Sequence, residues 1–167
     1  MNADAIRHLY EYHFAENRKL WDSHIMSLSQ EQFTQPVEYS VGSIRNQIVH
    51  LMSCDDYWFS GLRGLAMPDM RDPAGYDDRK RLRADWDTIE QNMRTYLATL
   101  RDDMIFQRPF PDTEDRVLLL WQVLLHITHH GADHRAQILR LLHDVGAKTG
   151  PQDYIFYIFD NLTFDNL

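Results

Sequence analysis

The sequence predicts an all-α protein, built as a four-helix bundle with long crossover connections. Four segments repeat apolar residues at steps of three and four, the spacing that places them on one face of an α-helix. Two of the connections are long: residues 61–77 are rich in glycine, proline and aspartate, and residues 101–116 contain Pro109 and Pro111. The remaining segments do not alternate apolar and polar residues as strands do. Helices of about 20 residues or more are ~30 Å long, which suits a bundle. The 167 residues are expected to form one domain.

The four helices are expected over residues 4–28, from residues 40–43 to 62, over 78–100 and over 117–145. Between the first two, residues 29–33 resemble a short capped helix that Gln35-Pro36 ends. The start of the last helix is apolar nearly all round, which predicts burial on several faces, and Gly146 is a natural stop for it. Residues 154–159, Tyr-Ile-Phe-Tyr-Ile-Phe, fit either a short strand or a helical turn that packs back on the bundle.

Composition excludes several classes of protein. The net charge of −8 argues against nucleic acid or an anionic membrane as the main partner. Cys54 is the one cysteine, so an intrachain disulfide and a cysteine-rich metal cluster are both excluded. No apolar stretch approaches the ~18 residues that a membrane span requires. The charged N-terminal segment lacks the apolar run of a signal peptide, so a cytoplasmic protein is expected.

A cluster of histidines lies in the last predicted helix. The segment His-Ile-Thr-His-His-Gly-Ala-Asp-His, residues 126–134, holds four of the nine histidines of the chain. On a helix His126, His130 and His134 form one column, whereas His129 lies about 100° further round. An imidazole without a partner is costly on the apolar side of a helix, and a metal ion would satisfy one ring nitrogen of each ligand. Spacing alone leaves open a metal site, hydrogen-bonded core histidines and a solvated face.

Several known motifs are absent. A zincin has glutamate directly after its first histidine, but Ile127 and Gly131 follow His126 and His130. Ferritin-like di-iron proteins have glutamate three residues before histidine, and none of the nine histidines has it. The sequence also lacks a phosphate loop and a nucleophile elbow. Two ligands on one helix need a third from elsewhere, and the candidates are His50, His13 and His24.

The histidine segment resembles the hallmark of the DinB-like family of metal-dependent proteins, in which a histidine and three further residues precede His-Arg-Gly-Gln. The segment "LLHITHHGADHRAQILRLLHDVG" carries this resemblance, with "IRNQIVHLMSCDDYW" similar to the segment of the family's first ligand and "GPQDYIFYIF" similar to its tail. The resemblance covers nearly the whole chain. The matching residues are His130, His134, Arg135 and Gln137, with His50 as the first ligand, and Ala136 replaces the family's glycine.

The resemblance implies a four-helix bundle, commonly a homodimer, that binds a divalent ion such as zinc or nickel through His50, His130 and His134. Three neutral histidines leave such an ion with open positions for water or substrate. The implied activity is hydrolysis, or thiol transfer of the glutathione type, on a small molecule. The alternative is a protein without enzymatic activity, a dimeric helical module whose metal is structural or that binds no metal. A fourth protein ligand would favour the structural role.

Residues around the predicted ligands have several possible roles. His126 is a partner of a ligand, a proton shuttle or a packed neighbour. Cys54 is either a fourth ligand or a buried structural cysteine, the commoner role of a free cysteine. Asn46 and Gln47 are expected to line the cavity beside His50, and Arg135 is expected to pair with an acidic neighbour.

Overall fold

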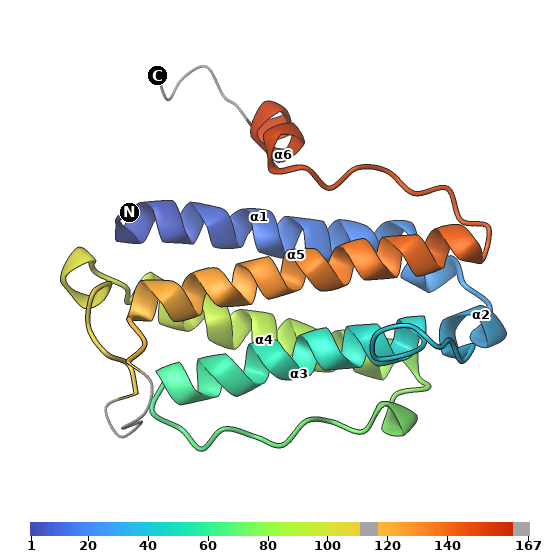
Figure 1. The fold of residues 1–167 in the computed structure, drawn as a ribbon, viewed down its shortest axis with the longest axis horizontal. Coiled ribbons are helices and arrows are strands. Elements are labelled where there is room, and N and C mark those ends of the chain that lie inside the picture. The colour runs from blue at the N-terminus through green and yellow to red at the C-terminus, as the bar shows by residue number, and fades with distance from the viewer. Residues whose placement is uncertain (111–116, 162–167) are drawn as a thin grey trace.

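The structure is a computed structural model that describes residues 1–110 and 117–161 of the 167-residue chain. Within these ranges all regular secondary structure is helical, which confirms the all-α class (Figure 1). The α-helices are α1 (Ala3–Ser23), α2 (Gln30–Thr34), α3 (Ile44–Leu62), α4 (Arg79–Ala98), α5 (Leu120–Asp144) and α6 (Tyr154–Asn161), with short 3₁₀ turns at Ile25–Ser27, Pro73–Gly75 and Asp102–Met104.

The four long helices pack so that α1 and α3 each contact both α4 and α5 (Figure 1). Helices that follow one another in the chain are therefore not always packing neighbours. The connection from α1 to α3 passes through α2, and the connection from α4 to α5 contains the Asp102–Met104 turn. Of the two long connections that the sequence predicted, the one between α3 and α4 joins helices that contact each other, and the one between α4 and α5 is described only in part. The core between the helices is apolar and aromatic, and includes Tyr10, Trp21, Ile48, Leu82 and Ile138, each no more than 2% exposed.

Polar side chains fix where the helices begin. The side chains of Asn2, Ser43 and Asp78 accept hydrogen bonds from backbone N–H groups in the first turns of α1, α3 and α4. Ser29 and Gln32 form a capping box at α2, the short capped helix that the sequence predicted. Gly146 ends α5 as predicted: its φ of 86° lies in the left-handed region, where a residue without Cβ is favoured.

Two predicted helix ends differ from the structure by three residues or more. The first helix ends at Ser23 rather than at residue 28, because His24 leaves the helical conformation (φ −131°, ψ −51°) and a separate 3₁₀ turn follows. The last long helix begins at Leu120 rather than at residue 117, after an extended Leu119 (φ −91°, ψ 150°). The long connection expected over residues 101–116 is described only to residue 110.

The tail that fitted either a strand or a helical turn is the helix α6, which lies beside α1 outside the main assembly (Figure 1). It packs through the rings of Tyr154 and Tyr157, which contact those of His8 and Tyr12 at centroid distances of 5.2 to 5.9 Å. No helix in the described part of the chain is long and apolar enough to cross a membrane.

Candidate metal centre

Two columns of functional side chains face each other where α3 packs on α5. On α3 the column contains His50 and Cys54, and on α5 it contains His130 and His134. The ring centroids of His50 lie 5.3 Å from His130 and 4.6 Å from His134, and those of His130 and His134 are 4.4 Å apart. The structure therefore brings together the three histidines that the sequence and the resemblance singled out.

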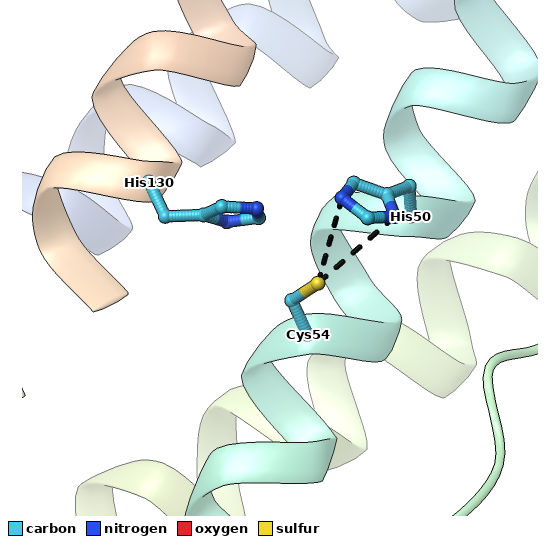
Figure 2. Close-up of side chains that lie close together, drawn as sticks. All are labelled: His50, Cys54 and His130. Atoms are coloured by element: carbon cyan, nitrogen blue, oxygen red, sulfur yellow. Dashed lines mark hydrogen bonds between the residues drawn. The ribbon is translucent and has the colours of Figure 1, made fainter. Parts of the chain in front are cut away.

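His50, Cys54 and His130 form a group of possible ligands, and their donor atoms all lie within 4.8 Å of one another. Figure 2 shows the ring of His130 extending from α5 toward the other two residues on α3. The Sγ atom of Cys54 lies 3.6 Å from Nε2 and 4.0 Å from Nδ1 of His50. His134 is next to this group through its ring contacts, and its Nδ1 lies 2.7 Å from Oε1 of Gln47. These three residues and His134 thus lie side by side between the two helices.

The electrostatic environment favours neutral imidazoles. The pKa of His130 is lowered to about 4 by burial and by the neighbouring His134, His50 and His126. Burial also lowers the pKa of His50, and burial together with His50 lowers that of His134. A neutral imidazole keeps a ring nitrogen with a free lone pair, which is the form that binds a metal ion. The three rings are therefore in their ligand form at neutral pH.

Cys54 differs from the histidines, because without a cation it is not in its ligand form. Burial and the charge of Asp55 raise the pKa of its thiol to about 11. The thiolate, not the thiol, is the metal ligand. Cys54 is half-buried beside His50, and its sulfur belongs to the same group of possible ligands as His50 and His130.

The remaining sequence candidates lie in other places. His126 is exposed at the edge of the site, where its ring is T-shaped against that of Trp58 at 5.5 Å and 5.8 Å from that of His130. His129 is exposed, as expected from its helical position. Asn46 does not line the site, because its side chain bonds to Ser43 and to the carbonyl of Val41 at the start of α3.

Two alternative third ligands are excluded by the packing. His24 forms the C-terminal cap of α1. His13 is fully buried on α1, where Asn17 lies 3.1 Å from its Nε2 and Arg135 lies 3.2 Å from its Nδ1. Both ring nitrogens of His13 thus have partners in a second polar cluster, formed between α1 and α5. Of the three candidates from elsewhere in the chain, only His50 reaches the pair on α5.

This second cluster corrects the prediction for Arg135. Its guanidinium is 1% exposed and hydrogen-bonds to three neutral groups, Asn17, Gln152 and His13, rather than to an acidic side chain. Sequence reasoning also missed Asp55, which is 1% exposed and lies 3.8 Å from His13 Nε2. Within the described residues neither carboxylate oxygen of Asp55 has a hydrogen-bond partner. The sequence carried one signal for a buried Asp55, because this aspartate lies within the apolar stripe of a predicted helix.

Comparison with known proteins agrees with the resemblance of the histidine segments. The model of the DinB family matches residues 1–162, a range that includes both helices of the site. The chain belongs to the DinB family. Protein DinB of Bacillus subtilis (strain 168) is 23% identical to it over 159 residues, which cover 90% of this chain and 92% of that protein. The DinB match thus extends over α1 to α6 rather than over the histidine segments alone.

The side chains present in this DinB-family chain fit a divalent transition-metal ion. Imidazole and thiolate donors suit ions such as zinc and nickel, whereas magnesium and calcium prefer oxygen ligands. The rings are neutral at neutral pH, and one nitrogen of His134 is already engaged by Gln47, as ligand histidines usually are. The cluster therefore has the donor chemistry that a metal ion requires.

Proposed function

We propose that this chain binds a divalent metal ion, zinc or nickel, through His50, His130 and His134, and that it is a metal-dependent hydrolase or thiol transferase acting on a small molecule. The observation that carries the proposal is the convergence of three neutral imidazoles from two helices, with ring centroids 4.4 to 5.3 Å apart. Three neutral ligands leave an ion its full positive charge and an open position, which is the arrangement of catalytic rather than structural sites.

The residues of the proposed site would have separate roles in binding the ion and in moving a proton. His50, His130 and His134 bind the ion, which supplies a Lewis acid and lowers the pKa of a water or thiol that it binds. His126 lies at the exposed edge, one helical turn before His130, and we assign it the role of a proton shuttle. A shallow depression lined by Trp121, His126 and His129 adjoins this edge, and we place the approach of the substrate there.

A specific observation favours the alternative function, a protein without enzymatic activity whose metal is structural. Cys54 Sγ lies 3.6 Å from Nε2 of His50 and belongs to the compact group of donors. If its thiolate joined the three histidines, the site would have four protein ligands and no open position. Cys54→Ser separates the two cases. A Co²⁺-loaded protein with a thiolate ligand shows a sulfur-to-metal absorption band that the variant lacks, whereas an open three-histidine site gives the same spectrum in both.

The ligand set is tested with protein purified without an affinity tag. Elemental analysis should show a stoichiometric metal, and added Zn²⁺ or Ni²⁺ should raise the melting temperature of the metal-free protein. His50→Ala and His134→Ala should each abolish tight binding, whereas the matched control His129→Ala, on the same helix but outside the column, should keep it. The proposal fails if no metal is present and the melting temperature does not respond, or if all three variants lose the metal equally.

The partners that we propose are a small-molecule substrate and a second copy of the chain, without nucleic acid or membrane. The net charge of −8 supports the exclusion of polyanionic partners. For a homodimer, α6 offers exposed apolar side chains at Ile155, Phe156 and Phe159, which are 50%, 45% and 62% exposed. Sedimentation of the wild type measures this directly, and a monomer over the whole accessible concentration range would contradict it. Assays of ester and amide hydrolysis and of thiol transfer distinguish the two proposed activities.

A further inference from the structure

A chain of hydrogen bonds leads from the surface of α5 to the ring of His134. Nε2 of Gln137 donates to Oδ2 of Asp133 at 3.0 Å, and Nε2 of Gln47 donates to Oε1 of Gln137 at 3.2 Å. Oε1 of Gln47 then lies 2.7 Å from Nδ1 of His134. Gln47 is 0% exposed, so its amide has no access to solvent as an alternative partner. Both ends of a fully buried amide are thus used between α3 and α5.

The direction of every bond in this chain is fixed at its exposed end. The carboxylate of Asp133 only accepts hydrogen bonds, so Gln137 must present its NH₂ group to it and its oxygen to Gln47. Gln47 must then donate with its own NH₂ group, which leaves its oxygen facing His134. An oxygen at 2.7 Å requires a hydrogen on the ring nitrogen opposite, so Nδ1 of His134 carries the proton. The other nitrogen, Nε2, keeps its lone pair.

We propose that Gln47 and Gln137 are positioning residues that hold His134 as the Nδ1–H tautomer, with its Nε2 lone pair available to a metal ion. This inference rests on the proposed function for its purpose, whereas its geometry comes from the hydrogen bonds of the protein itself. A tautomer chosen in advance removes one of the costs of metal binding, and loss of such an outer partner typically costs ~10–100-fold in metal affinity. Gln47 would therefore orient a metal ligand as well as pack between the two helices.

The first test is the tautomer itself, measured in metal-free protein by long-range ¹H–¹⁵N NMR of histidines labelled with ¹⁵N, with His134 assigned from its absence in His134→Gln. The wild type should show only the Nδ1–H form of His134. Detection of the Nε2–H form, or of a mixture of the two, would overturn the inference. This measurement needs no variant of Gln47, so it stands even if such variants fold poorly.

The second test compares variants that separate hydrogen bonding from packing. Gln47→Met keeps the length of the side chain but removes both polar ends, so His134 should become a mixture of tautomers and Zn²⁺ affinity should fall ~10–100-fold. Gln47→Glu still accepts from Nδ1 and should keep the Nδ1–H form. Gln137→Met leaves the amide of Gln47 free to rotate, so a mixture is again expected. Gln91→Met, on the exposed face of α4, is the control and should change neither quantity. An unchanged tautomer in Gln47→Met would overturn the inference.

The two proposals can fail separately in these experiments. Wild-type protein that shows the Nδ1–H form but binds neither Zn²⁺ nor Ni²⁺ would refute the proposed function and leave the hydrogen-bond chain intact. Tight metal binding with His134 in the Nε2–H form before the metal is added would refute the positioning role and leave the metal site.

Discussion

Gly131 lies between two of the proposed ligands on α5, and its replacement by alanine tests how tightly α5 packs on α1. A Cβ atom at this position would lie 2.3 Å from Cε1 and 2.7 Å from Nδ1 of His13, and 3.3 Å from Nη1 of Arg135. The ring of His13 is fully buried and has Asn17 and Arg135 as its partners. It cannot move aside without disturbing a buried hydrogen bond, so the methyl group must displace the helix or the ring.

Opposing effects set the size of the change. Alanine is the better helix former by about 1 kcal/mol, which alone would make Gly131→Ala more stable than the wild type. Forcing a methyl group into a packed interior costs about 1–3 kcal/mol, and disturbing the contact of Arg135 with His13 adds about 1 kcal/mol. The net expectation is a loss of roughly 1–3 kcal/mol of unfolding free energy. For a chain of this size that corresponds to a melting temperature lower by roughly 3–10 °C.

Thermal and urea denaturation followed by circular dichroism measure the effect, with Ala136→Gly as the matched control. Ala136 is on the exposed face of the same helix, so its replacement should cost only the helix propensity, about 1 kcal/mol. Propensity alone predicts opposite signs for the two substitutions, because one adds a methyl group and the other removes it. The packing of His13 predicts that both destabilise. A Gly131→Ala protein more stable than the wild type would refute this reasoning.

Two further predictions follow from the pKa values of the site, both for metal-free protein. Because the pKa of His130 falls from 6.5 to about 4 on folding, the unfolded chain binds more protons between these values, and the free energy of unfolding should decrease as pH is lowered through this window. The shift alone corresponds to roughly 3 kcal/mol, and screening of the partly exposed ring reduces the expected effect to about 1–2 kcal/mol. Urea denaturation at both ends of the window should show this loss in the wild type and less of it in His130→Gln; equal pH dependence in both would contradict the assignment. With its pKa raised to about 11, Cys54 should react with an alkylating reagent at pH 7 roughly a hundredfold more slowly than an ordinary thiol, and a normal rate would show that the thiol is not held as the structure places it.

Most of the fold could be predicted from the sequence, because its signals are local. The spacing of apolar residues marks the four long helices, and the chemistry of capping marks the start of the short α2 at Ser29 and the end of α5 at Gly146. The early end of α1 at Ser23 could not be predicted, since apolar residues continue at helical spacing into the 3₁₀ turn that follows. The tail at residues 154–159 was ambiguous because a short apolar run fits both a strand and a helix.

The site could be predicted only in part from spacing. His130 and His134 share a helix face, so their proximity is a local property of α5. Nothing local distinguishes His50 from His13, since both lie in mid-helix among apolar residues. The difference arises from packing, because α5 turns one face to α3 and another to α1. The resemblance to the family supplied the choice of His50. The direct bond from Gln47 to His134 depends on the register between two helices, which single-sequence reasoning does not give.

The two polar clusters on α5 include adjacent residues, His134 and Arg135, which point to different sides of the helix. Adjacent residues are about 100° apart round the helix axis, so His134 faces α3 and the ring of His50 while Arg135 faces α1 and the ring of His13. The separation of the two clusters on α5 explains why a methyl group fits at residue 136 but not at residue 131. The family's glycine after arginine is replaced by Ala136, whose side chain is exposed and meets neither cluster. Gly131 lies where α5 meets His13, and there a methyl group has no room. The constraint on this helix is therefore set by close packing at Gly131, and the replacement at residue 136 leaves the proposed ligands undisturbed.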